Sequence, residues 1–347
     1  MARFAALIKN NFAKVKNIST IFLFLLPAVI FIISLTMGRY QIGPFEVFKV
    51  LLSPIFPSVG DEIPDIARQL ILRVRLPRIM AALFIGASYG VTGAGFQAIF
   101  KNPLVDSNIL GVTSGAGFGA ALALLFAGGP LVVQVSAFLF GLLAVFLSFY
   151  GSRLYKTSPL LVLTLMGILI GSFFSSMTSL LKYVADPLDT LPAITFWLLG
   201  SLTGITWQNL LPLGVIIIPG IIFIWLLRWR LNVLSLGDSE ATALGVDPTK
   251  MKVAFIIFST LMTAAAVSVS GVIGWIGLVI PHAGRLIVGP DHKRLIPVSL
   301  SLGAAFLMGI DDIARTVLPG EIPLGILTGL IGVPILVLLM RQNRSGW

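Results

Sequence analysis

The sequence has no cysteine, only two histidines and few charged residues, which make up 11% of its 347 residues. The lack of cysteine excludes disulfides, thiolate metal sites and cysteine nucleophiles within the chain. Hydrophobic residues make up 57%, so polar side chains cannot cover a water-soluble globule of this size. These scarcities argue against a metalloenzyme or redox protein and indicate a chain that lies largely in lipid.

Motifs that carry chemistry are also missing. No G-x-x-x-x-G-K-[ST] phosphate loop occurs, so we do not expect this chain to hydrolyse ATP itself. No Asp, Glu, Lys or Arg falls near the middle of a predicted membrane span, whereas proton-coupled carriers usually need an ionisable group at that depth. His282, in GLVIPHAGRL, is better explained as a packing or hydrogen-bonding group than as a catalytic base. We therefore predict no catalytic residue, no metal site and no cofactor in this chain.

Ten charge-poor segments predict membrane-spanning helices. A helix needs about 20 apolar residues to cross the hydrocarbon, because its backbone polar groups must bond within the segment. The predicted spans cover residues 21–38, 78–100, 105–127, 130–150, 159–182, 209–228, 251–271, 272–288, 295–315 and 323–341. The first follows basic residues as in a signal peptide, but no small-residue cleavage site follows it, so we expect it to be retained.

Two shorter apolar stretches, 43–53 and 188–201, predict interfacial or re-entrant helices. The predicted fold class is thus an all-α polytopic membrane protein with a single transmembrane domain over residues 1–347. Ten spans divide into two halves of five, 1–205 and 206–347, and an odd number in each half inverts the second relative to the first. Small-residue-rich helices after a basic entry in both halves support this inverted arrangement.

The basic residues predict the orientation, because cytoplasmic loops are enriched in lysine and arginine. With both termini inside, two thirds of the 24 lysines and arginines fall on the inner side, and most acidic residues fall outside. This topology explains the net charge of +10 better than nucleic-acid binding does, since the basic residues form no continuous stripe. We predict a multi-pass protein of the inner (plasma) membrane with cytoplasmic termini and no nucleic-acid partner.

One outer segment departs from this charge bias. Arg68, Arg73, Arg75 and Arg78 crowd the outer entrance to the second predicted span. These arginines could snorkel to lipid headgroups. Alternatively, they could form an exposed basic patch on which an acidic partner docks outside the membrane. The residues alone leave both alternatives open.

Glycine is abundant, with 35 residues, many of them inside predicted spans. Plain helix packing explains most of them, since glycine lets two helices approach closely. One predicted helix differs, because its small residues and hydroxyls form a surface suited to a water-filled path. The candidate pathway residues are Gly167, Gly171, Ser172, Ser175 and Ser176.

The longest polar stretch on the predicted inner side has residues 235–247 at its centre. A capping serine or aspartate and the apolar residues Ala241, Leu244 and Val246 predict a short amphipathic helix there. This segment could simply be a solvated loop without a partner. It could also be a lever whose apolar side inserts into a groove on a cytoplasmic motor protein.

At these residues the sequence resembles the FecCD, or type II, family of permeases in ABC importers for vitamin B12, haem and ferric siderophores. The resemblance runs through LRVRLPRIMAALFIGA, GAGFQAIFKNPLVDSNILGVTSGAGFGA, LGDSEATALGV, GVIGWIGLVIPHAGRLIVGPDHKRLIP and DDIARTVLPGEIPLGILTGLIGVP. Ser107, where the family commonly has proline, and Ala283-Gly284, in place of bulkier apolar residues, depart from the usual pattern. Five ordered matches make chance agreement remote.

The resemblance implies the partners and the site residues. It implies a second permease subunit, expected to be a copy of this chain, a cytoplasmic ATPase dimer that uses ATP and Mg, and an extracytoplasmic substrate-binding protein. It also implies that Arg75, Arg78 and Arg315 receive acidic residues of that binding protein. The implied ATPase-coupling residues are Leu236, Gly237, Asp238, Glu240, Ala241, Leu244 and Gly245.

The cargo that the resemblance implies is a metal chelate, namely an iron-siderophore, haem or cobalamin. Family members also import molybdate or tungstate, and no motif separates these cargoes. A stand-alone secondary carrier or channel and a membrane-embedded enzyme are the alternatives from other classes. The carrier predicts transport without nucleotide, and the enzyme predicts a convergent polar or metal site within the spans.

Overall fold

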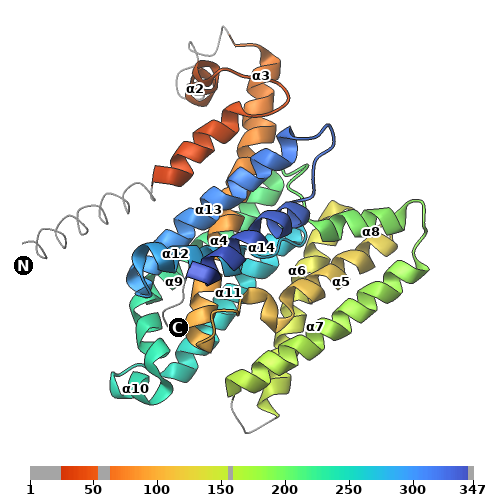
Figure 1. Ribbon diagram of the computed structural model, residues 1–347. Coiled ribbons are helices and arrows are strands. Elements are labelled where there is room, and N and C mark those ends of the chain that lie inside the picture. Colours follow the sequence, from red (N-terminus) through yellow and green to blue (C-terminus); the bar gives the residue numbers. More distant parts are fainter. Residues whose placement is uncertain (1–24, 54–62, 155–158, 343–347) are drawn as a thin grey trace, which may run out of the picture.

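The computed structural model describes residues 25–53, 63–154 and 159–342, and these residues form helices and connecting segments without any strand (Figure 1). The predicted all-helical class is confirmed. The α-helices are Leu25–Thr36, α2 (Pro44–Leu52), α3 (Asp65–Gln69), α4 (Leu76–Phe100), α5 (Val112–Leu125), α6 (Pro130–Arg153), α7 (Pro159–Val184), α8 (Thr190–Leu199), α9 (Trp207–Leu236), α10 (Asp238–Ala243), α11 (Pro248–Ser270), α12 (Ile276–Val288), α13 (His292–Thr316) and α14 (Leu324–Gln342). A π-helical segment, η2 (Leu70–Arg75), precedes α4, and a 3-10 turn, η3 (Ser107–Leu110), precedes α5.

Each of the ten predicted spans overlaps one of these helices, and the two shorter stretches form α2 and α8. Six helices in the described part of the chain are long and apolar enough to cross a membrane, namely α6, α7, α9, α11, α13 and α14. The start of the first predicted span and the basic residues before it lie in residues 1–24, outside the described residues. The division into two inverted halves stays a prediction.

Two helices begin later than the hydropathy predicts. The span predicted from residue 105 opens with η3, whose first turn is capped by Asp106, and Gly111 with φ +84° then allows α5 to begin. The span predicted from residue 272 opens with irregular chain, because Gly271 with φ +67° ends α11. Both interruptions lie in apolar sequence, so hydropathy could not locate them.

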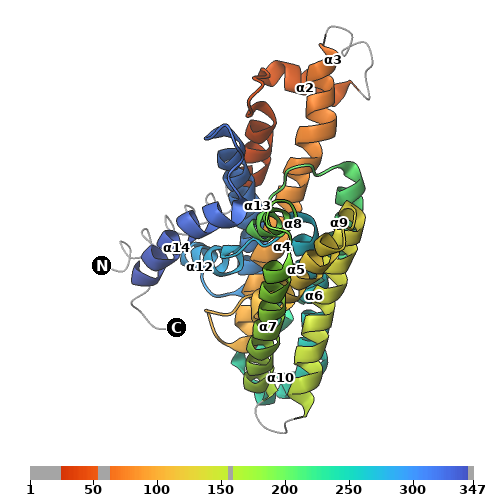
Figure 2. The ribbon, with the colours of Figure 1, turned by 90° about the vertical axis from the view of Figure 1, so that its right-hand side faces the viewer.

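Helix α4 lies at the centre of the molecule, with α9, α11, α12 and α13 packed around it (Figures 1 and 2). Twenty of its 25 residues are buried, including Tyr89 and Phe96. By contrast α7 at the periphery exposes large apolar side chains such as Leu169 and Phe173. The exposed apolar surface of α7 fits lipid or another membrane-embedded protein as its surroundings.

Glycines allow α4 to touch its neighbours backbone to backbone. A Cβ atom added at Gly86 would lie 2.2 Å from the carbonyl oxygen of Gly303 on α13, and one added at Gly303 would lie 2.2 Å from that of Gly86. One turn farther along, a Cβ at Gly90 would lie 2.2 Å from the carbonyl oxygen of Ser299. These pairs confirm that packing is the role of these glycines, and they fix the antiparallel register of α4 and α13.

A second hydrophobic cluster joins α5, α6, α7 and α8. Phe118, Phe140 and Phe174 form its aromatic centre, with ring centroids 5.1 Å apart for the first pair. Here too a glycine brings two backbones together, since a Cβ at Gly115 of α5 would lie 2.4 Å from the carbonyl oxygen of Phe140 on α6. Helices α5 to α8 therefore pack as a group beside the helices that surround α4.

Two glycines of α13 test this packing. We expect Gly303→Ala to destabilise the protein by about 1–3 kcal/mol, because the added methyl group meets the backbone of α4. We expect Gly309→Ala to be neutral or to stabilise α13 by up to about 1 kcal/mol, since no atom lies within 4 Å of its added Cβ. Thermal midpoints of the detergent-solubilised protein measure both, and equal midpoints for the two variants would contradict the backbone contact.

Candidate functional sites at the two ends of the bundle

A buried ion-pair network connects α4 to α13 at one end of the bundle, which we call the outer end after the predicted orientation. Arg78 bonds to Asp311 on α13, with 2.9 Å between Nη2 and Oδ1, and to Glu321 in the turn before α14, with 2.8 Å between Nη1 and Oε1. The side chain of Asp311 is 1% exposed, whereas that of Glu321 is 32% exposed. Arg78 therefore joins a fully buried carboxylate to one that water reaches.

The pKa of Glu321 reflects this position. Partial burial raises the pKa, but the hydrogen bonds from Arg78 and the Thr203 hydroxyl outweigh burial and lower it below the ordinary value for glutamate. Glu321 is therefore ionised at neutral pH. The ionised Glu321 side chain stabilises the folded protein fully at pH values above its unfolded-state pKa. This stabilisation is lost as the pH falls through the lower pKa of the folded state.

Arg315 belongs to the same network. It forms an ion pair with Asp312 and a longer one, 3.7 Å between Nε and Oδ2, with Asp311. Its Nη1 also donates to the carbonyl oxygen of Met37, and the Ser34 hydroxyl donates to Asp312 at 2.6 Å. The network thus ties the end of the helix Leu25–Thr36 to α13.

Arg75 is held differently, because it bonds to backbone carbonyl oxygens. It donates to Leu35 at 2.6 Å, to Thr36 at 3.2 Å and to Tyr40. Its guanidinium lies against Gly38, where an added Cβ would be 2.7 Å from Nη2. Within the described residues no carboxylate forms an ion pair with Arg75, so its positive charge is solvated but not neutralised.

These arginines surround a pocket of about 530 Å³ at the outer end. Its lining residues are Gly38, Arg39, Tyr40, Leu70, Val74, Arg75, Arg78, Thr203, Arg315 and Glu321. Four arginines and one glutamate give the pocket an excess of positive charge, which favours an anionic ligand or side chain.

The expectation of an exposed arginine patch was wrong for two of its four members, Arg75 and Arg78, and Arg315, which the resemblance adds to them, is buried as well. Arg75, Arg78 and Arg315 are only 4%, 8% and 7% exposed, while Arg68 and Arg73 are exposed. The buried arginines bond within the chain to groups that are distant in sequence, which a charge count cannot detect. Their role in docking a partner stays a prediction.

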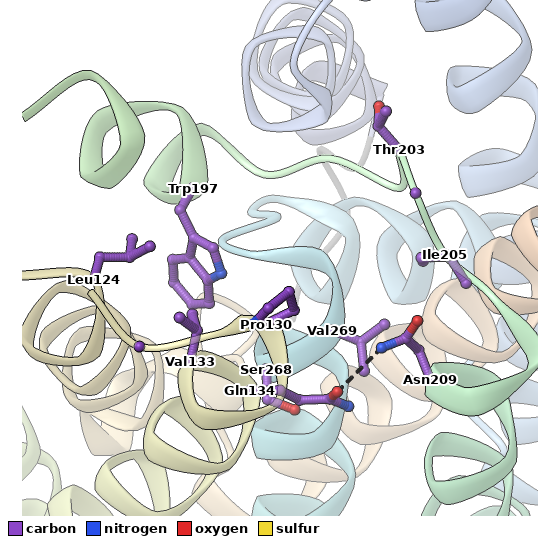
Figure 3. Close-up of a pocket in the computed structure, with 12 residues that line it drawn as sticks. Leu124, Pro130, Val133, Gln134, Trp197, Thr203, Ile205, Asn209, Ser268 and Val269 are labelled. Atoms are coloured by element: carbon purple, nitrogen blue, oxygen red, sulfur yellow. Dashed lines mark hydrogen bonds between the residues drawn. The ribbon is translucent and has the colours of Figure 1, made fainter. Parts of the chain in front are cut away.

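A second pocket, of about 320 Å³, lies next to the outer one and shares Thr203 with it (Figure 3). Trp197 of α8 forms one wall, and a hydrogen bond of 3.2 Å from Asn209 to Gln134 crosses between the first turns of α9 and α6. Its lining residues carry no ionisable group. The pocket therefore offers neutral hydrogen-bonding groups and an indole but no acid or base.

At the opposite, inner end, residues 238–243 form the short helix α10. Gly245, with φ +77°, allows the chain to turn at its end, and Val246 N–H donates back to the carbonyl oxygen of Ala241 at 2.9 Å. Ala241 and Val246 are buried against the protein itself, while Leu236 and Leu244 are 62% and 55% exposed. The apolar residues that could insert into a partner are therefore the two leucines.

Polar contacts fasten α10 and the end of α9, which leads into it, to the neighbouring helices. Lys252 of α11 forms an ion pair of 2.6 Å with Asp238, and Lys101 after α4 donates to the carbonyl oxygen of Leu236. Asn232, near the end of α9, donates to Asp291 before α13 at 2.6 Å and accepts from the N–H of His292. Movement of α10 would therefore reach α4, α9, α11 and α13.

The five candidate pathway residues of α7 divide into two kinds. Gly167 and Gly171 are buried against η3 and the start of α5, where a Cβ at Gly167 would lie 2.2 Å from the carbonyl oxygen of Ile109 in η3. Ser172, Ser175 and Ser176 are exposed. The glycines serve packing in this structure, and the serines give an otherwise apolar helix a hydroxyl-bearing face.

The sequence reasoning missed the partners that organise both ends, namely Asp311, Asp312, Glu321, Asn232, Lys101 and Lys252. The adjacent Asp311 and Asp312 were the available signal, since two acids at the end of a predicted span require cations nearby. In the described part of the chain no three metal-ligating side chains lie together.

Comparisons with known proteins identify the family and the relatives of this chain. The chain matches the FecCD transport family over residues 25–342. It is 39% identical to the molybdate import system permease protein of Haemophilus influenzae, over 93% of this chain and 95% of that protein. It is 37% identical to a Helicobacter pylori protein described as an iron chelatin transport system permease, over 80% and 83% of the two chains.

A solved structure is also similar. It is described as an inward-facing conformation of a metal-chelate type ABC transporter, and its sequence is 37% identical. The TM-score is 0.83, and the match covers 93% of this chain and 98% of that one. The similarity therefore extends over nearly the whole arrangement of helices.

A double-mutant comparison tests the buried ion pair. We expect Arg78→Met to destabilise the protein by about 3–5 kcal/mol, because it leaves the Asp311 carboxylate buried beside a weaker set of cations. Adding Asp311→Leu should recover part of the loss, since it removes the buried carboxylate. Thermal midpoints measure both, and a double variant less stable than the single one would contradict this account.

The control for this comparison is an exposed pair. Lys250 and Asp247 are 3.3 Å apart, with side chains 86% and 49% exposed. We expect Lys250→Met to leave the thermal midpoint unchanged, because solvent screens such pairs.

Proposed function

This chain belongs to the FecCD transport family, and we propose that it carries a metal chelate across the membrane with energy from ATP hydrolysis in partner subunits. It is the membrane-spanning permease subunit of an ABC importer, and the ATPase activity is assigned to a partner chain. The similarity over 93% of the chain to a metal-chelate type transporter carries the cargo proposal. The chain itself changes no covalent bond of the cargo.

A specific observation favours a second cargo class. The relative that is 39% identical over 93% of this chain is a molybdate import system permease. Molybdate and tungstate are oxyanions, and the outer pocket with its four arginines would attract such anions. The alternative is therefore the same transporter importing an oxyanion.

We propose α10 as the contact with the cytoplasmic ATPases, which would bind ATP and Mg. The exposed Leu236 and Leu244 support this proposal, since apolar side chains on an otherwise polar loop fit a hydrophobic groove. Asp238, Glu240 and Gly245 complete the proposed contact surface. Gly237 and Ala241 shape the helix that carries it. The ion pair of α10 with α11, and the bonds of the end of α9 to Lys101 and to the start of α13, would transmit ATPase movement to the spans.

We propose a second copy of this chain as the neighbour in the membrane, with the pathway between the two. The exposed hydroxyls of Ser172, Ser175 and Ser176 support this arrangement, because hydroxyls on an apolar helix are favoured at helix interfaces. The charge bias supports cytoplasmic termini. On the outer side, a substrate-binding protein would dock with acidic residues near Arg75, Arg78 and Arg315.

Uptake into proteoliposomes tests the function and the cargo together. With the cognate ATPase and binding protein present, we expect uptake of labelled cargo to require ATP and to stop when the binding protein is omitted. Ferric siderophore, haem, cobalamin and molybdate are the cargoes to compare. Uptake without nucleotide would support the stand-alone carrier instead, and uptake of molybdate alone would replace the metal-chelate proposal.

A single exposed residue tests the role of α10. We expect Leu244→Asp to separate the permease from its ATPase, because a charged carboxylate cannot enter an apolar groove without losing its hydration. The matched control Leu244→Met keeps an apolar side chain and should keep the complex. Copurification and transport-coupled ATP hydrolysis are the measurements. A complex with Leu244→Asp that stays intact and coupled would refute the proposal that α10 is the contact with the ATPase.

A further inference from the structure

Arg78 holds two carboxylates that differ in how easily they can leave. Asp311 is 1% exposed and also lies 3.7 Å from Arg315, so its removal from Arg78 would leave a buried charge poorly compensated. Glu321 is 32% exposed and lies in the turn between α13 and α14, where water can solvate it after release. The Glu321 side of Arg78 is therefore the exchangeable side.

Glu321 also fastens three segments of the outer end together. The Thr203 hydroxyl, in the connection between α8 and α9, donates to the same carboxylate that pairs with Arg78 of α4. Next to Glu321, the N–H of Ile322 donates to the carbonyl oxygen of Ala314 at 3.1 Å. Release of Glu321 would remove the only side-chain bonds that this turn makes to α4 and to Thr203 within the described residues.

The remaining charges of the pocket explain why a carboxylate would enter there. Arg75 bonds to carbonyl oxygens and keeps its full positive charge, and Arg39 likewise donates to the carbonyl oxygen of Leu318. An acidic side chain that enters the pocket of about 530 Å³ would meet these cations first. It would still compete with Glu321 for Arg78.

We propose that Glu321 is a resident carboxylate that occupies the position of a docking partner's acidic side chain on Arg78, so that docking exchanges one carboxylate for another. The occupant is an acidic side chain of the substrate-binding protein, and the inference rests on the docking that we propose above. Exchange releases the turn before α14 from Arg78 and from Thr203. Docking at the outer surface is thereby coupled to the position of the first turn of α14.

The exchange predicts how the affinity changes when Glu321 loses its charge. Glu321→Gln keeps the size of the side chain but removes the competing carboxylate and replaces one of its two accepting oxygens with an amide group that only donates. We expect it to tighten docking about tenfold, which is the size of a change in one charge-assisted hydrogen bond. The binding protein should then find Arg78 without a competitor.

The experiment measures the Kd of the cognate binding protein for the full permease–ATPase complex in nanodiscs. The matched control is Asp189→Asn, which removes one negative charge from an exposed position on the outer side. The Asp189 side chain precedes α8 but makes no capping hydrogen bond to it. We expect Asp189→Asn to leave the Kd unchanged. Equal tightening by both variants would indicate a general charge effect and would overturn the exchange.

Arg78→Gln separates failure of this inference from failure of the docking proposal. If Arg78→Gln weakens docking but Glu321→Gln leaves it unchanged or weakens it, the partner uses Arg78 without displacing Glu321 and the exchange is wrong. If charge-removing variants of Arg75, Arg78 and Arg315 all leave docking unchanged, the docking proposal itself is wrong.

Hydrogen exchange gives a readout that a merely structural role of Glu321 would not move. We expect the amides of residues 317–324 to exchange faster when the binding protein docks on the unmodified complex. In Glu321→Gln they should exchange fast already, with no further change on docking. Thr203→Val, which keeps the charge of Glu321 and removes one of its bonds, provides a milder second variant that should tighten docking less. Slower or unchanged exchange on docking would overturn the release of the turn.

Discussion

The backbone contact between α4 and α13 is the constraint on which the other features depend. Because Gly86 and Gly303 touch, the two antiparallel helices have one register, and each residue of α4 has a fixed counterpart on α13. Arg78 lies eight residues from Gly86, and Asp311 lies eight residues from Gly303 in the opposite chain direction. The ion pair at the outer end is therefore a consequence of the glycine contact. Any side chain at either glycine would separate the helices and the charges together.

This register also explains why arginines gather at the end of the bundle that should carry few of them. A carboxylate buried at a helix end needs a cation that no water can replace. Arg78 and Arg315 supply that charge for Asp311 and Asp312. The departure from the charge bias is thus caused in large part by pairing within the chain. The pocket side of the network, with Arg75, Arg39 and Glu321, is where we propose that a partner docks.

The sequence alone predicted the parts of the fold that depend on local composition. Apolar runs of sufficient length located the helices, six of which are long enough to cross a membrane, and the amphipathic stretch 235–247 contained α10. The sequence could not predict pairings that depend on helix register, since Arg78 meets carboxylates 233 and 243 residues away. It identified small residues as packing positions but not which backbone each would touch. It also could not separate Leu244, which is exposed, from Ala241 three residues earlier, which is buried.

The α4–α13 pair extends from one candidate site to the other. At its outer end Arg78, paired with Asp311, borders the arginine pocket, and at its inner end Lys101 and His292 bond to the end of α9, which leads into α10. The glycine contacts leave no space for the two helices to slide past each other, because a shift of one residue would press a Cβ atom against a carbonyl oxygen. A displacement applied at one end must therefore move the pair as a unit or act on its neighbours. The turn before α14, held to the pair through Glu321, is a neighbour that can move while the register stays fixed.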